Sequence, residues 1–158
     1  DDWAGVAMDA LIEAVLAQHT QRRAAAVTLS GPAIILSPEA AQNLGLAIHE
    51  LAVNAARHGA LSSPRGKVNI EWSLSDGEGG RQIDFMWTES GGPSVQEPAR
   101  SGFGMMVIRR NLARAMGADV QLDFQPAGLV ARLSLPHDDL APRIRSTEEQ
   151  LGSTYQVV

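Results

Sequence analysis

Apolar and polar residues recur with two different periods along the chain, and these periods predict its helices and strands. Between residues 6 and 18 the apolar positions recur at helical spacing, which predicts an amphipathic helix. Ser37-Pro38-Glu39 is typical of a helix start, because serine caps free amide groups, proline suits the first helical position and glutamate favours the positive end of the helix dipole. We expect this second helix to continue to about His58 and to stop at Gly59, a residue that readily takes the left-handed conformation found at helix ends.

Strand-like segments come in pairs that are separated by turn residues. Alternating or β-branched apolar residues mark each segment, and Gly, Pro, Ser or Asp residues lie between the two members of a pair. The pairs are residues 27–29 with 34–36, 67–75 with 82–87, and 120–124 with 129–135. A third helix is expected over residues 102–116, after a long loop over residues 90–100 that is rich in Gly, Pro and Ser.

This order of elements predicts the fold class. Strands joined in pairs by tight turns form a largely antiparallel sheet, and about three helices are available to cover one of its faces. We therefore expect an α/β two-layer sandwich with a mixed, mostly antiparallel sheet over residues 1–136. A doubly wound parallel fold needs regular alternation of strands and helices, which the sequence lacks. Residues 137–158 are polar and charged, and we expect a partly disordered tail there.

The composition narrows the classes of function. The 158 residues fit one domain, and the formal net charge of -5 disfavours a nucleic-acid or anionic-membrane surface, since both need a basic field. There is no cysteine, which excludes disulfides, thiolate metal sites and cysteine nucleophiles. No apolar run approaches the roughly 20 residues of a membrane-spanning helix. We expect a soluble domain with no nucleic-acid partner and no membrane contact.

Four polar residues of the second helix are spaced to lie along one stripe: Glu50, Asn54, Arg57 and His58. A metal–triphosphate needs this combination of groups. The amide oxygen of Asn54 suits Mg²⁺, the carboxylate of Glu50 can orient or deprotonate an attacking group, and Arg57 can offset phosphate charge. On spacing alone, a surface helix with a solvated polar face is the more common explanation of such a stripe.

A second motif, Trp87-Thr88-Glu89-Ser90-Gly91-Gly92-Pro93, lies at the end of a predicted strand. A carboxylate that emerges from a sheet into a glycine turn can accept a hydrogen bond from the exocyclic amine of a purine. The glycines allow the backbone to approach the ring closely. An ordinary β-turn after a strand is the alternative explanation.

A third motif, Gly102-Phe103-Gly104-Met105, opens the third predicted helix. Glycines at a helix N-terminus leave free amide groups and the positive dipole end pointing at one spot, which suits a phosphate. The motif is neither a Walker loop nor the dinucleotide-binding fingerprint, and a lone Gly-x-Gly before a helix is weak evidence.

Each motif is weak alone, but chance rarely produces all three in this order on a matching antiparallel scaffold. The sequence resembles the ATPase superfamily of gyrase, Hsp90, histidine kinases and MutL, and within it the HWE histidine kinases. The resemblance covers roughly residues 3–136. It rests on His49 directly before Glu50, on Trp87-Thr88-Glu89, and on residues 49–66, 102–110 and 128–136.

The resemblance implies a role for each residue of the three motifs, with ATP and Mg²⁺ as cofactors. Asn54 would ligate Mg²⁺, and Glu50 would orient or activate the reacting group. Glu89 would anchor adenine in place of the family's usual aspartate. The residues implied to bind other parts of the nucleotide are Arg57 and His58 near the phosphates, Gly91 at the adenine pocket, and Gly102, Phe103 and Gly104 around the phosphates. Residues 90–101 would form the nucleotide lid.

Other residues receive structural roles. Trp3 and Trp72 are expected to pack, and Trp87 is expected to pack in a way that positions Glu89. His49 points away from the Glu50 stripe, so a structural or supporting role is expected for it. His19 is interpreted as an exposed residue near a helix end, because its flanking residues do not resemble a phosphoacceptor segment.

The resemblance also implies partners and a reaction. A kinase of this type transfers phosphoryl from ATP to a histidine on an upstream dimerisation segment, and then to an aspartate of a response regulator receiver domain. This chain starts about where that segment should end, so we expect it to bind nucleotide without autophosphorylating alone. The expected location is the cytoplasm. The alternatives are an anti-sigma-type serine kinase or binding module, and a non-catalytic nucleotide sensor.

Overall fold

The computed structural model describes residues 5–20, 26–77, 80–93, 110, 114 and 117–136. Along the chain, the helices and strands within these residues are β1 (Val6–Ala7), α1 (Met8–Ala17), β2 (Val27–Ser30), β3 (Ile35–Leu36), α2 (Pro38–His58), the 3₁₀ helix η2 (Ala60–Ser62), β4 (Lys67–Gly77), β5 (Gly80–Ser90), β6 (Asp119–Gln125) and β7 (Gly128–Pro136).

The main sheet has five strands in the order β2-β4-β5-β7-β6. Only the pair β2–β4 is parallel, and the other three pairs are antiparallel. The β4–β5 hairpin closes at Gly77 and Gly80, and the β6–β7 hairpin closes at Gln125 and Gly128. The mixed, mostly antiparallel sheet and the two hairpins predicted from the alternation are thus confirmed.

The predicted pairing of residues 27–29 with 34–36 is wrong. β2 pairs in parallel with β4, while β3 pairs with β1 in a separate two-stranded sheet. The segment between the two strands is fixed on β4, because the indole N–H of Trp72 donates to the carbonyl of Pro32 at 2.8 Å. β1 also takes the first two residues that the apolar spacing assigned to the first helix, so α1 begins only at Met8.

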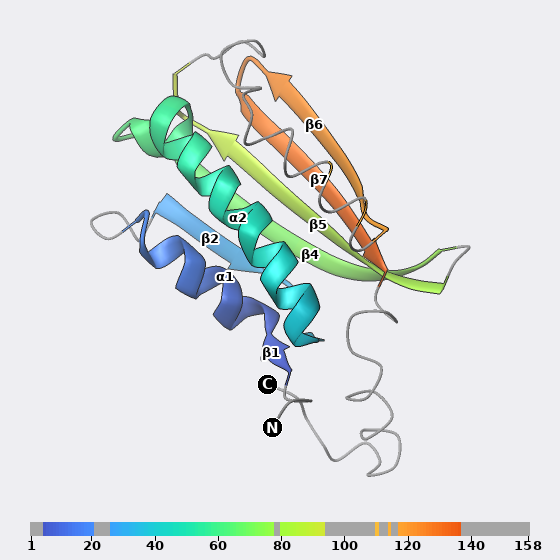
Figure 1. Cartoon of the computed structure of the whole chain (residues 1–158). Coiled ribbons are helices and arrows are strands. Elements are labelled where there is room, and N and C mark those ends of the chain that lie inside the picture. The colour runs from blue at the N-terminus through green and yellow to red at the C-terminus, as the bar shows by residue number, and fades with distance from the viewer. Residues whose placement is uncertain are drawn as a thin grey trace.

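Both described helices lie on the same face of the main sheet (Figure 1), which confirms the two-layer α/β sandwich. The face of α2 that is buried consists largely of alanine, so the helix can lie close to the sheet. Its buried residues are Ala40, Ala41, Leu44, Ala47, Ile48, Leu51, Ala52 and Ala55. Of the expected third helix, only Arg110 and Arg114 belong to the described residues, and both are helical and exposed.

The two ends of α2 agree with the sequence pattern to different degrees. The Ser37 hydroxyl accepts a hydrogen bond from the Ala40 amide at 3.1 Å, as expected of a helix cap, which typically stabilises a protein by about 1 kcal/mol. The helix ends at His58, as predicted. However, Gly59 has φ -118° and ψ -144°, so the expected left-handed conformation is absent. The chain passes through Gly59 directly into η2.

Within the described ranges, no helix is both long and apolar enough to cross a membrane. The expected tail over residues 137–158 lies outside these ranges, as does Trp3.

Candidate functional site

Glu89 is a buried carboxylate at the end of β5, with only 2% of its surface exposed. Its Oε1 accepts the backbone N–H of Ala60 at 3.0 Å, and its Oε2 accepts the indole N–H of Trp87 at 2.9 Å. Burial of a carboxylate is costly unless hydrogen bonds compensate for the lost water, and these two donors do so. The expected packing of Trp87 against Glu89 is therefore observed, and it includes a direct hydrogen bond. The Ala60 donor was not predicted.

Three segments that are distant in the sequence meet around this carboxylate. They are the residues just after α2, the end of β5 with the turn that follows, and the β6–β7 turn. The cavity between them is lined by Gly59, Ala60, Glu89, Ser90, Gly92, Pro93, Phe124, Ala127, Gly128 and Leu129. The lining combines polar groups, such as Glu89 and Ser90, with the apolar side chains of Pro93, Phe124 and Leu129. A fixed polar group beside apolar side chains is compatible with recognition of the base of a nucleotide.

Two glycines allow the backbones of these segments to touch. Gly91 has φ +73°, and a Cβ atom there would lie 2.3 Å from the carbonyl oxygen of Arg65. Gly128 has φ +145°, and a Cβ atom there would lie 2.3 Å from the carbonyl oxygen of Glu89. Neither position accepts a side chain without a shift of the backbone. Gly91 lies in the turn beside the cavity and does not line it.

The four residues of the predicted stripe occur on α2, just before the segment that reaches Glu89. Glu50 and Asn54 are half-buried, whereas Arg57 and His58 are exposed. With a helical rise of 1.5 Å per residue, Asn54 and Glu50 lie about 6 and 12 Å along the axis from His58. A ligand held at Glu89 must therefore be extended if it is to reach these two side chains.

The predicted phosphate-binding residues Gly102, Phe103 and Gly104 lie outside the described residues, as does the lid beyond Pro93. Within the described part of the chain, no group of three or more His, Asp or Glu residues is placed to hold a metal ion. Magnesium in nucleotide sites commonly takes one or two protein oxygens and completes its shell with phosphates and water. The single amide oxygen of Asn54 fits that pattern.

His19 and His49 form a contact between the end of α1 and the middle of α2. The Nε2 atom of His19 lies 3.3 Å from the Nδ1 atom of His49, and the ring centroids are 5.1 Å apart. The interpretation of His19 as solvent-exposed is wrong, because the residue is half-buried against its partner. The position of His49 against α1 agrees with the structural role expected for it.

We expect the free energy of unfolding to fall as the pH drops below about 6.5, with a contribution from His19. Burial, and then the charge of His49, lower the pKa of His19 below its ordinary value. The unfolded chain therefore takes up the proton more readily than the folded chain, so stability rises with pH through this window. Urea unfolding between pH 5 and 8 measures the slope. His19→Gln should flatten it, and an unchanged slope in that variant would exclude His19 as a source.

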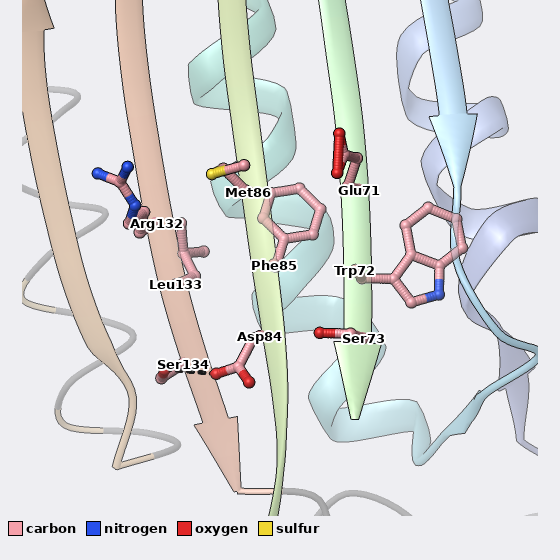
Figure 2. A pocket seen from close by; sticks show the side chains of 9 residues that line it. All are labelled: Glu71, Trp72, Ser73, Asp84, Phe85, Met86, Arg132, Leu133 and Ser134. Atoms are coloured by element: carbon pink, nitrogen blue, oxygen red, sulfur yellow. Dashed lines mark hydrogen bonds between the residues drawn. The ribbon is translucent and has the colours of Figure 1, made fainter. Parts of the chain in front are cut away.

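A larger hollow of about 370 Å³ lies on the face of the sheet away from the helices (Figure 2). Its Asp84 carboxylate accepts hydrogen bonds from Ser134, which also lines the hollow, and from Ser75 and Gln82 beside it. None of the residues singled out from the three motifs lines it. We therefore regard this hollow as part of the solvated face of the sheet.

The fold and the three motifs define the class of protein. The model of the family described as histidine kinase-like ATPase domain matches residues 12–134. The chain therefore belongs to this family, and the resemblance found in the sequence is confirmed.

Two curated proteins are similar to most of this chain. Blue-light-activated histidine kinase 1 of Erythrobacter litoralis is 42% identical over 139 residues, which are 85% of this chain and 37% of that protein. A blue-light-activated histidine kinase of Brucella ovis is 34% identical over 136 residues, which are 86% of this chain and 28% of that protein. The chain thus spans about a third of the length of these curated relatives.

A solved structure supports the fold. The catalytic domain of the histidine kinase ThkA, in a nucleotide-free form, superimposes with a TM-score of 0.61 over 84% of this chain and 95% of that one. Because the two sequences are only 14% identical, this similarity concerns the fold alone.

Proposed function

We propose that this chain is the ATP-binding catalytic domain of a two-component sensor histidine kinase, with the catalytic unit at residues 1–136. The domain transfers the γ-phosphoryl group of ATP to a histidine on an upstream dimerisation segment. A response regulator receiver domain then takes the group onto an aspartate. The observation that carries the proposal is the buried Glu89 carboxylate, which is fixed just beyond the C-terminal end of the helix α2 that bears Glu50 and Asn54.

Adenine binding is assigned to the cavity at Glu89. The carboxylate accepts the exocyclic amine of the base, while Phe124 and Leu129 supply apolar wall. Gly91 would help to shape the adenine pocket through its close backbone contact with Arg65. Because the proposed substrate is ATP and the proposed partner is a receiver domain, we place the domain in the cytoplasm.

The remainder of the nucleotide extends along α2. Asn54 would hold Mg²⁺, which when bound offsets the charge of the phosphates and orients them. Arg57 and His58 would add positive charge or donors near the phosphates, and we also assign Gly102, Phe103 and Gly104 to phosphate binding. Glu50 accepts a hydrogen bond from the N–H of the attacking imidazole, which makes the opposite ring nitrogen a better nucleophile.

The test is phosphorylation of the full-length protein with radiolabelled ATP and Mg²⁺. We expect label that is labile in acid and stable in alkali, on a histidine outside this chain. This chain alone should bind ATP and remain unlabelled. Acid-stable phosphoserine would indicate a serine kinase instead, and absence of any label despite ATP binding would indicate a nucleotide sensor.

A further inference from the structure

We propose that Trp87 is a positioning residue for base recognition, because its indole N–H fixes the Glu89 carboxylate that reads the exocyclic amine of adenine. This inference rests on the proposed function of the site. It adds a determinant of nucleotide specificity that does not itself have to touch the base.

The hydrogen bond from Trp87 to Glu89 lies entirely within the protein interior. The two residues are two positions apart on β5, so their side chains project from the same face of the sheet. Trp87 has 0% and Glu89 has 2% of its surface exposed. Water therefore competes little for the 2.9 Å contact between the indole nitrogen and Oε2.

The roles of donor and acceptor at this carboxylate are unambiguous. An indole nitrogen only donates, and so does the backbone N–H of Ala60. Each carboxylate oxygen must therefore direct a lone pair at its own protein donor. A carboxylate offers about four acceptor directions, so it can hold both donors and still accept an amine from a ligand.

The two donors belong to different parts of the fold, and together they fix the orientation of the carboxylate. Trp87 belongs to β5, whereas Ala60 begins η2 directly beyond α2. Without the indole donor, Oε2 would lose the hydrogen bond that holds it toward β5. Discrimination between bases with and without an amine depends on that orientation, because a misplaced acceptor gains little from the amine.

Trp72 provides a matched comparison within the same sheet. It is also buried, with 5% of its surface exposed, and its indole N–H donates to the carbonyl of Pro32 at 2.8 Å. Loss of either indole donor removes one hydrogen bond, which is buried at Trp87 and partly buried at Trp72. Only the loss at Trp87 removes a hydrogen bond to Glu89.

The experiment compares the dissociation constants of ATP and of purine riboside triphosphate, which lacks the 6-amine, by calorimetry in Mg²⁺. Wild type should prefer ATP by at least about tenfold, as expected for a hydrogen bond to a charged group. Trp87→Phe keeps an aromatic ring but removes the donor, and it should lose most of that preference. Trp72→Phe should retain it. The double variant Trp87→Phe with Glu89→Ala should have the same preference for ATP as Glu89→Ala alone, because Trp87 acts through Glu89.

The outcomes separate this inference from the proposed function. Failure of wild type to bind ATP would overturn the proposed function. Equal binding of both nucleotides by wild type would overturn the role of Trp87 together with the assignment of Glu89 as acceptor of the amine. A preference that survives in Trp87→Phe would overturn the role of Trp87 alone. Both results would leave phosphoryl transfer to histidine standing.

A measurement on the wild type keeps the inference testable if Trp87→Phe does not fold. The chain has three tryptophans, so a ¹⁵N spectrum contains three indole N–H signals. Trp3→Phe and Trp72→Phe identify two of them, and the third belongs to Trp87. We expect the Trp87 signal to shift further with ATP than with the purine nucleotide, while the Trp72 signal stays constant. Identical responses of the Trp87 signal to both nucleotides would contradict the proposal.

Discussion

Substitution of Glu50 with glutamine is expected to lower the rate of histidine phosphorylation by the complete kinase by about 10²–10⁴-fold. Glutamine keeps the size of the side chain and can still form a hydrogen bond, but it cannot take up a proton or carry the negative charge that polarises the attacking imidazole. Glu50 is half-buried on α2 and lies outside the set of residues through which the helix packs on the core. The substitution should therefore leave folding and MgATP affinity nearly unchanged.

The matched control for this experiment is Glu39→Gln. Glu39 is an exposed carboxylate in the first turn of the same helix, far from the cavity at Glu89. Its loss removes a favourable interaction with the helix dipole of at most about 1 kcal/mol, and the phosphorylation rate should not change. If Glu50→Gln phosphorylates histidine as fast as Glu39→Gln does, Glu50 has no part in the transfer step.

Substitution of Glu89 with alanine is expected to destabilise the domain by about 2–5 kcal/mol and to weaken ATP binding at the same time. The change removes the acceptor of two buried donors, the Trp87 indole and the Ala60 amide. Glu89→Gln should be intermediate in stability, because its side chain has only one acceptor oxygen. Its amide nitrogen would have to face one of the two N–H groups. Urea unfolding and ATP titration measure the two effects separately.

Glu71→Gln serves as the control for Glu89. Glu71 is exposed on the face of β4 that is turned away from the helices, and the amide of Asn69 donates to it at 2.7 Å. Exposed interactions of this kind contribute little, so stability should change by less than about 1 kcal/mol. An effect of Glu89→Ala as small as that of Glu71→Gln would mean that the two buried hydrogen bonds do not stabilise the fold.

The sequence predicts those parts of the fold that depend on local chemistry. The cap at Ser37 and the end at His58 are local features, and both bounds of α2 are confirmed. The β4–β5 and β6–β7 hairpins follow from alternation around turn residues, and both are observed. Each of these signals acts between neighbours in the chain, so no knowledge of the tertiary structure is needed to interpret it.

Features that depend on contacts between distant segments were missed. β2 pairs with β4 about 40 residues later, and its apolar residues do not specify which strand it joins. His19 meets His49 only because α1 packs on α2. The Ala60 donor is a backbone amide, which every residue except proline has, so no residue type marks it in the sequence. Glu89, in contrast, was found from its position at a strand end before two glycines.

The most direct test of the ATP-site assignment is thermal unfolding of this chain with ATP and Mg²⁺, compared with Mg²⁺ alone. ATP at about 100 times its dissociation constant adds roughly 2.7 kcal/mol of stability. For a domain of this size we predict a rise in the unfolding midpoint of about 5–10 °C, and its loss in Glu89→Ala after correction for the lower starting stability. An unchanged midpoint at millimolar ATP would contradict the assignment of the cavity at Glu89 as an ATP site.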